Sequence, residues 1–568
     1  MAGIIQGRSV KKDLTGNKTL KPDFCIIGSG AGGGACALKL AEAGFDTVVL
    51  EEGPDIPLKQ GHGGECHTRA ILKERESLMY RLLYQEGAGR LTSDSSTLIL
   101  QGRCLGGGTA VNWSACLPPP DWTLKRWQQD YGLPFTTDKL RPFIQEVVNY
   151  LHIHNNTRYN TSACRMICGC KKLGYPFKNL PNNTLECREC GSCGTGCPYD
   201  RKQSGFVKWI PDAAGLTATP AQPATVYTDT HVWDLIVQNR KVRRVVGRFL
   251  DGTTKRTGKK IHVEPKLGVI FAAGAVGTPS ILLRAQSFAE TRPEPLQLSP
   301  HLGKRTHIHP VTICFGRYGD ETHSAYGVPD NMMTDKFAAG PTGYLIETGS
   351  SFPVMTAILS LEFGADLIGF MKQYYPRQTV LYAHHTSGFD RGHTYGQVRV
   401  VGTDFRPEFE YNLDIKNEQP MRESLKEMTK IHLAAGAKEV YHVTNPAIRI
   451  TSTAELGKLD NVDFKMGKTS MLTVHVMGGC AMGSDPNTSV VDTDFRLRGL
   501  DNAWVVDGSL FPTGLGANPQ VTIYAMALWG AKKICEQNGR LAQFNLHQQQ
   551  PNWPWDPSPP GDEPCQCA

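Results

Sequence analysis

The chain has 568 residues, of which 40% are hydrophobic and 20% are charged, and its formal net charge is +7. These are the proportions of a globular protein with a sizeable core, and the length predicts several domains or one large two-domain enzyme. The charge is mild for this length and includes no basic run of the kind that binds nucleic acid. No stretch approaches 18 consecutive apolar residues, so we expect no transmembrane helix.

The first twenty residues are polar, with Lys11, Lys12 and Lys18, and lack the apolar centre of a signal peptide. The 17 cysteines are scattered from Cys25 to Cys567. Together these features favour reduced thiols and a cytoplasmic protein, because disulfides are rare in that compartment. Membrane association or export would then depend on a partner.

A strand–turn–helix–strand pattern opens the folded part of the chain, over residues 24–27, 28–33, 35–43 and 46–50. Its turn is a G-x-G-x-x-G motif, in which Gly28, Gly30 and Gly33 would let a pyrophosphate approach the N-terminus of the helix. Glu51 lies 18 residues past Gly33 and is placed to accept hydrogen bonds from ribose hydroxyls. The pattern predicts a dinucleotide site, but the motif alone does not separate FAD from NAD.

Two further glycine-rich segments indicate that the nucleotide-binding domain is assembled from separated parts of the chain. Residues 106–113 contain three successive glycines, which place the backbone close to a flat or phosphorylated group. Residues 268–275 are typical of a buried strand and a tight turn, and we expect a helix from Pro279 through Arg284.

Four cysteines lie in one compact run, Cys187-x2-Cys190-x2-Cys193-x3-Cys197, with Pro198 directly after it. This is the bacterial ferredoxin spacing, in which thiolates hold an iron–sulfur cluster. The alternatives are two disulfides or a zinc site, although zinc usually takes two separated Cys-x2-Cys pairs. We expect the four cysteines to bind a [3Fe-4S] or [4Fe-4S] cluster.

The identity of the fourth ligand of this cluster stays open. In two-cluster ferredoxins the last cysteine of the run binds the other cluster, and this chain has no second run. Either Cys197 turns back onto the same cluster, or one of Cys164, Cys168 and Cys170 completes it. Three ligands alone would hold a three-iron cluster.

The C-terminal region contains the candidate catalytic residues. His475 precedes two glycines, Asp507 and Gly508 follow an apolar strand, and Asn518 and Pro519 precede a long apolar helix over residues 521–533. A histidine beside glycines is free to reach a ligand, although a lone histidine is more often structural.

These segments resemble the glucose–methanol–choline (GMC) oxidoreductases, which bind FAD, over about residues 22–535. Residues 107–114, 306–310 and 434–437 are most similar to the long-chain alcohol oxidase and dehydrogenase branch, and the segments around His475 and Asn518 also resemble cholesterol oxidases. Some bacterial sugar dehydrogenases of the family carry a three-iron cluster, so the resemblance also supports the cysteine run as cluster ligands.

The resemblance implies an α/β fold with a Rossmann-like FAD-binding domain and an antiparallel-sheet substrate domain. We expect the FAD domain over 20–115, 220–310 and 470–540, the substrate domain over 116–219 and 311–469, and a Pro-rich tail, disordered or docked on a partner, over 541–568. The residues expected to contact FAD are Gly28, Gly30, Gly33, Glu51, Gly107, Gly108, Asn112, Val232, Gly274, Asp507, Gly508, Asn518 and Pro519.

The resemblance also implies an oxidoreductase acting on CH-OH donors. His475 would take the hydroxyl proton, because imidazole titrates near neutral pH, while hydride moves to flavin N5 and Asn518 holds the oxygen. Electrons would pass through the cluster to an acceptor protein, a cytochrome or small subunit. Around the cluster, Arg188, Arg201, Lys202 and Lys208 would form a basic rim that steers this partner, or an ordinary solvated surface.

The expected substrate is a hydrophobic alcohol, since residues 352–375 are apolar and suit a channel wall, although ordinary core is an equally good interpretation. Three alternatives stay open: a cluster-containing sugar dehydrogenase, an oxygen-using alcohol or sterol oxidase, and a flavoprotein that does not oxidise alcohols.

Overall fold

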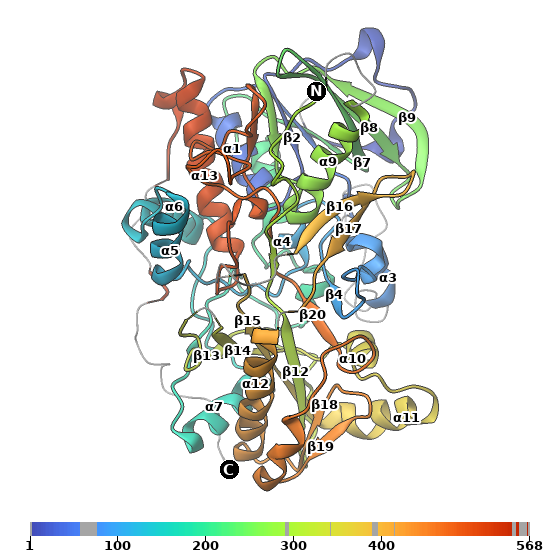
Figure 1. Ribbon diagram of the computed structural model, residues 1–568, viewed down its shortest axis with the longest axis vertical. Coiled ribbons are helices and arrows are strands. Elements are labelled where there is room, and N and C mark those ends of the chain that lie inside the picture. Colours follow the sequence, from blue (N-terminus) through green and yellow to red (C-terminus); the bar gives the residue numbers. More distant parts are fainter. Residues whose placement is uncertain are drawn as a thin grey trace.

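The computed structural model describes residues 3–56, 76–289, 295–340, 342–388, 396–413, 415–547, 553–555 and 565. Two sheets organise these residues, and they lie one above the other in Figure 1. Along the described ranges no helix is both long and apolar enough to cross a membrane.

The upper sheet consists of parallel strands in the order β1-β6-β3-β2-β10-β22. Their bounds are β1 Gly3–Gln6, β6 Thr225–Thr228, β3 Thr47–Leu50, β2 Phe24–Ile27, β10 Gly268–Phe271 and β22 Ala503–Val505. The central strands β2, β3 and β10 are buried along their whole length and have continuous apolar sequences, as expected for a parallel sheet covered on both faces. Helices α1 (Ala31–Glu42) and α13 (Gln520–Gln537) pack against each other beside this sheet.

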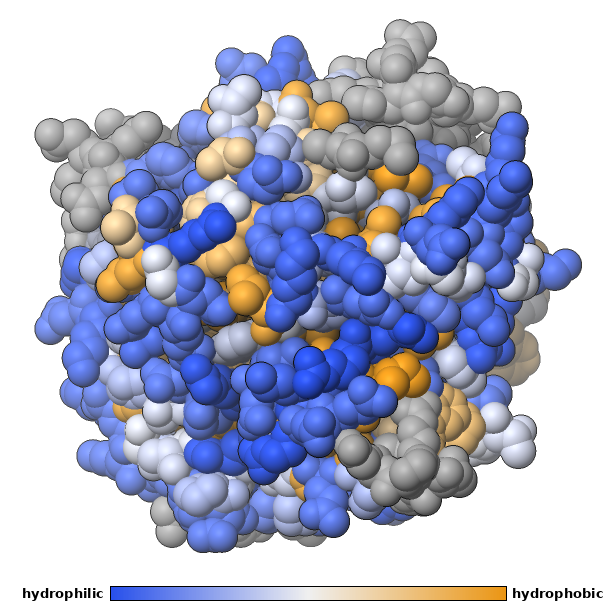
Figure 2. All heavy atoms as spheres, turned by 90° about the horizontal axis from the view of Figure 1, so that it is seen from above, coloured by the Kyte–Doolittle hydropathy of each residue, from blue (hydrophilic) through white to orange (hydrophobic). Residues whose placement is uncertain are grey.

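Additional elements enlarge the upper part of the molecule. An antiparallel sheet of β7 (Thr230–Gln238), β8 (Lys241–Leu250) and β9 (Arg256–Val263) lies near α9. Helix α9 spans Gly274–Ala289, so it begins five residues before the start expected at Pro279. Figure 2 views this end from above and shows a mostly hydrophilic surface with small apolar areas.

The lower sheet is largely antiparallel, with the order β19-β18-β12-β15-β14-β13-β5, and β20 pairs with β12 while β4 pairs with β20. The bounds are β19 Ile448–Ile450, β18 Glu439–His442, β12 Val311–Arg317, β15 Gln378–His385, β14 Tyr344–Gly349, β13 Met332–Thr334, β5 Lys178–Asn179, β20 Met471–Thr473 and β4 Thr97–Ile99. Helices α7 (Thr161–Leu173) and α12 (Ile415–Ala434) cover one face. A parallel sheet joined to an antiparallel one confirms the predicted fold class.

Several short elements connect the two sheets. The antiparallel hairpin of β16 (Gln397–Val401) and β17 (Arg406–Glu410) contacts α9. The antiparallel pair of β11 (Thr306–Ile308) and β21 (Val476–Gly478) also contacts α9, through β21. Helix α6 (Thr137–Tyr150) packs against α13, and α5 (Asp121–Tyr131) precedes it. Residues 121–150, placed in the substrate domain at the sequence level, therefore contact the parallel-sheet part of the molecule.

The C-terminal residues return to the body of the chain. Cys565 forms a disulfide with Cys164 on α7, and Cys168, one turn further along that helix, is also disulfide-bonded. Trp555 Nε1 donates to the carbonyl of Cys116 at 2.9 Å, and Arg141 lies 4.6 Å from the ring centre of Trp553. The prediction of reduced thiols is therefore wrong for these cysteines, and Cys164 and Cys168 are not available as cluster ligands. The described tail residues dock on their own chain, because their indole rings have apolar surface to bury.

Candidate active site

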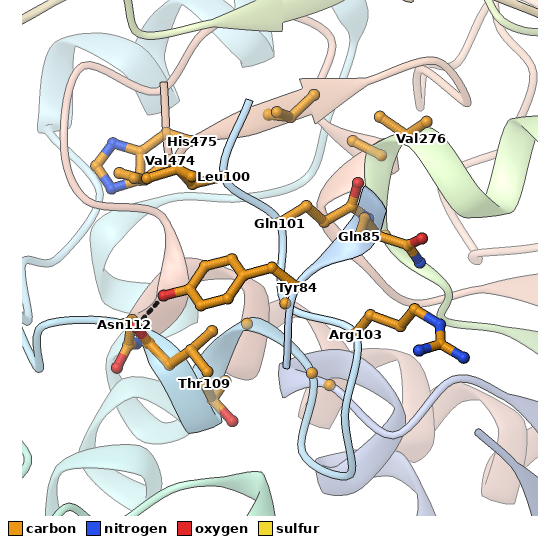
Figure 3. Close-up of a pocket in the computed structure, with 18 of the residues that line it drawn as sticks. Tyr84, Gln85, Leu100, Gln101, Arg103, Thr109, Asn112, Val276, Val474 and His475 are labelled. Carbon is orange, nitrogen blue, oxygen red and sulfur yellow. Dashed lines mark hydrogen bonds between the residues drawn. The ribbon is translucent and has the colours of Figure 1, made fainter. Parts of the chain in front are cut away.

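A cavity of about 510 Å³ lies between the two sheets. From the parallel sheet it is lined by the turns after β2 and β10, and from the lower sheet by side chains of β12 and β15. Every residue expected to contact FAD lines it except Gly33, and His475 lines it too. Figure 3 shows His475 and Val474 on one side of the space, with Thr109 and Asn112 across from them and Tyr84 reaching towards Asn112.

The flavin end of the cavity, as we call the part formed by the turns after β2 and β10, is built from backbone. A Cβ at Gly32 or Gly33 would lie 2.0 Å from a carbonyl oxygen, so α1 packs directly on neighbouring backbone there. A Cβ at Gly30 or Gly108 would meet nothing within 4 Å. The helix is therefore held tightly while its N-terminal turn stays open, which fits a group such as a pyrophosphate.

Glu51 holds this end together. Its carboxylate accepts hydrogen bonds from the Ser29 N–H at 3.0 Å, the Ser29 hydroxyl at 2.7 Å and the Gly53 N–H at 2.7 Å. The Ser29 oxygen in turn accepts from the Gly106 N–H at 2.9 Å, which joins two of the glycine segments. Burial raises the pKa of Glu51 to about 7. Hydrogen bonds to a carboxylate lower its pKa, and further donors would therefore favour the charged form of Glu51.

Asp507 joins the remaining segments at this end. Its carboxylate accepts from the Gly274 N–H at 2.8 Å, from the Thr278 hydroxyl at 2.5 Å and from the Ser509 N–H at 2.8 Å. Burial raises its pKa. Nearby, the Asn112 amide donates to Gln520 Oε1 at 2.9 Å, and the Val232 carbonyl accepts from Arg284 at 2.5 Å.

The opposite part, which we call the substrate end, is built from side chains. His475 follows β20 and His309 follows β11, and the pairing of Ile308 with Val476 sets these two histidines side by side. Their Nδ1 atoms lie 3.1 Å apart. Burial, followed by the neighbouring His384 and His309, lowers the pKa of His475. A neutral imidazole is therefore expected near pH 7.

A buried carboxylate lies behind His475. The ring of His384 on β15 stacks on that of His475, with 5.0 Å between centroids, and its Nε2 lies 3.2 Å from Glu347 Oε2. Asn518 Nδ2 donates to the same oxygen at 3.3 Å. Burial alone would raise the pKa of Glu347, but His384 and Asn518 outweigh it and the pKa is lowered. Burial and the charge of Glu347 raise the pKa of the adjacent Asp330, so we assign the charge to Glu347.

Sequence reasoning singled out His475 and Asn518 but missed His384, Glu347 and Asp330. Glu347 is the only charged residue of β14, a strand otherwise buried along its length, and that contrast was the available signal. His309 lies in the segment 306–310, which drew attention only for its resemblance.

The rest of the substrate end is mostly apolar, although Asp330, Ser350, Ser351 and Tyr382 also line the cavity. Four residues of the segment 352–375 line the cavity, as a channel wall would: Phe352, Met355, Thr356 and Leu359. Apolar side chains of β12 and its neighbours complete the wall: Val311, Ile313, Phe315, Val380 and Leu472.

The cysteine run lies outside the cavity, behind the 107–113 loop. Tyr84, which lines the cavity, donates from its hydroxyl to the Gly194 carbonyl at 2.5 Å. Lys202 is buried rather than exposed on a basic rim, because its ammonium donates to the carbonyls of Asn112 at 2.7 Å and Cys193 at 2.9 Å. One buried cation thus connects the loop that lines the cavity to the run.

The sulfur atoms of the run accept hydrogen bonds. The Glu189 N–H lies 3.3 Å from Cys187 Sγ, the Arg201 N–H lies 3.3 Å from Cys197 Sγ, and the Ser114 hydroxyl lies 3.7 Å from Cys193 Sγ. All four cysteines of the run are free thiols. Over the residues that the structure describes, no group of three or more Cys, His, Asp or Glu is gathered as a site for one metal ion.

Comparison with known families gives three matches. Two models described as GMC oxidoreductase match residues 80–311 and 393–527, and an FAD-binding-domain model matches residues 23–59. Together the first two cover more than half of the chain.

Individual relatives are distant. The chain is 27% identical to a long-chain-alcohol oxidase of Arabidopsis thaliana over 89% of its own length and 67% of the relative's. It is 24% identical to a cholesterol oxidase of Mycobacterium tuberculosis over 96% and 97% of the two lengths. The crystal structure of pyridoxine 4-oxidase from Mesorbium loti superposes with a TM-score of 0.67 at 17% identity, over 90% of this chain and 98% of that one. That last likeness bears on the fold alone.

Proposed function

The chain belongs to the GMC oxidoreductase family, whose members use FAD to oxidise CH-OH donors, and we propose that it oxidises a hydrophobic alcohol. One observation carries the proposal. A single cavity has a backbone-built end that suits a dinucleotide and an end where His475, His384 and Asn518 face apolar walls. Such a site accepts one hydroxyl group on an otherwise apolar molecule.

The flavin end fits FAD because space is left open at Gly30 and Gly108, and because Glu51 is a buried acid that ribose hydroxyls would stabilise. The turn at Gly28–Gly33 would hold the pyrophosphate, and the segments joined by Asp507 would hold the ring system. FAD, when bound, supplies the acceptor for the hydride from the alcohol carbon.

The substrate end supplies proton chemistry and orientation. Oxidation of an alcohol requires that the hydroxyl proton leave as hydride leaves the carbon. The imidazole of His475 can contact the hydroxyl directly, and that of His384, which stacks on it, lies within hydrogen-bond distance of Glu347. The Asn518 amide donates to the same carboxylate and so keeps it in place.

The final electron acceptor is proposed to be oxygen. The similar relatives of known activity are named as oxidases, including the long-chain-alcohol and cholesterol oxidases. A turnover assay that compares the yield of hydrogen peroxide with the reduction of an artificial dye tests this. Peroxide formed in proportion to alcohol consumed supports an oxidase, whereas dye reduction without peroxide supports a dehydrogenase.

A second candidate is a cluster-linked dehydrogenase. Hydrogen bonds to three of the four sulfurs and the nearby cation of Lys202 support it, because such donors and cations stabilise thiolates, while burial acts against them and raises the pKa of Cys187, Cys193 and Cys197. An iron–sulfur cluster at Cys187, Cys190, Cys193 and Cys197 would then relay single electrons to a protein acceptor. Purified protein that contains flavin but neither iron nor acid-labile sulfide would reject this candidate.

The substrate class is tested by a panel of long-chain alcohols, sterols and sugars, scored by flavin reduction without oxygen. Reduction by apolar alcohols is the expected result, since most of the wall is formed by apolar side chains of β12 and of the segment 352–375. Reduction by sugars alone would instead favour a sugar dehydrogenase, and reduction by none would favour a flavoprotein of another activity.

A further inference from the structure

The hydrogen bonds around His309 determine which of its ring nitrogens carries the hydrogen. The Gly516 N–H points at His309 Nε2, with 3.2 Å between the nitrogens, and a backbone N–H can only donate. His309 Nε2 is therefore an acceptor. A neutral imidazole has one acceptor nitrogen and one N–H, so the hydrogen of His309 is on Nδ1.

The neutral form of His309 agrees with its surroundings. The side chain is buried, and burial, followed by the nearby His384, His307 and His385, lowers its pKa to about 3. An imidazolium would also turn an N–H of Nε2 towards the N–H of Gly516, which would leave two donors facing each other. Geometry and burial thus select the same form.

The hydrogen of His309 Nδ1 points at His475. The two Nδ1 atoms are 3.1 Å apart, so His475 Nδ1 must accept this hydrogen bond. His475 is also neutral, because burial lowers its pKa, and its own hydrogen must then be on Nε2. In the described part of the chain Nε2 of His475 has no hydrogen-bond partner, and the side chain lines the cavity.

The stacked neighbour His384 is held by a carboxylate. His384 Nε2 lies 3.2 Å from the charged carboxylate of Glu347, which can only accept, so Nε2 of His384 bears a hydrogen. Its Nδ1 is buried and has no hydrogen-bond partner among the described residues. Of the two stacked imidazoles, His475 is therefore the one that offers an N–H to the cavity.

We propose that His309 fixes the hydrogen of His475 on Nε2, and so makes His475 the hydrogen-bond donor to the alcohol oxygen. This rests on the proposed function, since the oxygen is that of the alcohol. The N–H of His475 orients the hydroxyl oxygen, and the carbonyl product can accept the same hydrogen bond. The role differs from that expected of His475 from the sequence, in which it takes the proton.

His309 is a positioning residue in this scheme, and two substitutions separate its two hydrogen bonds. Asn places its amide nitrogen where Nδ1 of histidine lies, so His309→Asn keeps the donor to His475 and loses the contact with Gly516. Gln reaches further and meets the Gly516 N–H with its carbonyl oxygen, so His309→Gln keeps that contact and loses the donor. The two variants are matched in polarity and differ in whether they keep the hydrogen bond to His475.

The direct test is nitrogen-15 NMR of the flavin-loaded protein labelled at histidine, without substrate. The His475 signals are assigned by their loss in His475→Gln, and the couplings show which ring nitrogen bears hydrogen. We expect hydrogen on Nε2 in the wild type and in His309→Asn, and a mixture of both forms in His309→Gln. Hydrogen on Nδ1 of His475 in the wild type overturns the inference, whatever the protein oxidises.

Turnover provides the second readout. We expect His309→Gln to lower kcat roughly 10- to 100-fold, the usual cost of removing a partner that orients a functional histidine, and His309→Asn to lose clearly less. Equal losses in both variants would assign His309 a purely structural role. If the NMR result is as expected but no alcohol reduces the flavin, the tautomer stands and the proposed function fails.

Discussion

The two ends of the cavity differ in what lines them: backbone groups at the flavin end and side chains at the substrate end. At the flavin end, turns such as Gly28–Gly33 offer backbone groups and open space, and carboxylates such as Glu51 serve mainly to join the turns. At the substrate end, imidazoles from separate strands line the cavity, and the carboxylate of Glu347 lies behind them. Substitutions at the flavin end should therefore change cofactor affinity and stability, whereas those at the substrate end should change turnover with the cofactor still bound.

A first test of this contrast is His384→Ala. His384 stacks on His475 and pairs with Glu347, and removal of a partner that orients a functional histidine costs roughly 10- to 100-fold in kcat. We expect the purified variant to keep its flavin, measured by absorbance against protein concentration, because His384 lies at the substrate end.

His385 supplies the matched control for that experiment. It is the next residue on β15 and points away from the cavity, where its Nε2 lies 3.0 Å from the Ser424 hydroxyl. His385→Ala is expected to lower thermal stability and to leave kcat near wild type. A turnover loss in His385→Ala as large as in His384→Ala would place the effect in folding rather than chemistry.

His475→Ala is expected to have the larger effect. Loss of one preorganised donor to the reacting oxygen costs roughly 10²- to 10³-fold in kcat. The flavin again stays bound, so stopped-flow flavin reduction by alcohol isolates the chemical step. Unchanged flavin reduction in this variant would contradict any role for His475 at the alcohol.

The difference between the ends also explains what could be predicted from the sequence. The motifs of the flavin end are local, because one turn brings its glycines together whatever the rest of the chain does. The dinucleotide-binding unit followed from apolar strands beside such turns, whereas the fold class came from the family resemblance, and the structure confirms that fold class. FAD rather than NAD needed the family resemblance, since the turn chemistry is shared.

The substrate end depends on strand pairing that no local pattern reveals. In β14 and β15 Glu347 pairs with Tyr382 and Leu345 pairs with His384, so the carboxylate and the imidazole meet only as diagonal neighbours across two strands. The disulfide between Cys164 and Cys565 joins residues 401 positions apart, and it too could not be predicted from a local pattern. Spacing alone also could not tell these bonded cysteines from the free ones at 187–197.

Glu51→Gln tests the flavin end. A charged hydrogen bond to a ribose hydroxyl is worth about 1.5–3 kcal/mol, so we expect the affinity for FAD to fall roughly 10- to 100-fold, with kcat near wild type once FAD is saturating. Glu52→Gln is the matched control, since Glu52 also lines the cavity but pairs with Arg103 at 3.5 Å. A large loss of kcat at saturating FAD would break the contrast between the ends.

The same variant makes a pH prediction for the protein without FAD. The pKa of Glu51 is raised from 4.5 to about 7, so the folded state binds this proton more tightly than the unfolded state. The resulting stability is fully present below about pH 4.5 and is lost as the pH rises through 7, a change of about 3 kcal/mol. Urea unfolding should therefore show wild type losing stability relative to Glu51→Gln between pH 5 and 8, and parallel curves would show that Glu51 is not the group responsible.

Asn518→Ala should have the smallest effect, because its amide is only one of several groups at Glu347. The amide donates to Glu347 Oε2 at 3.3 Å, and His384 holds the same oxygen at 3.2 Å, so the carboxylate stays partnered when the amide is removed. One hydrogen bond of about 1.4 kcal/mol corresponds to a loss of roughly 10-fold in kcat. Asn518→Asp is the informative companion, since it sets a second carboxylate against Glu347 and should be worse than alanine. Steady-state kinetics on both variants decides the point: an aspartate no worse than alanine would mean that Glu347 carries no charge, and His384 would then lose the partner that fixes its hydrogen on Nε2.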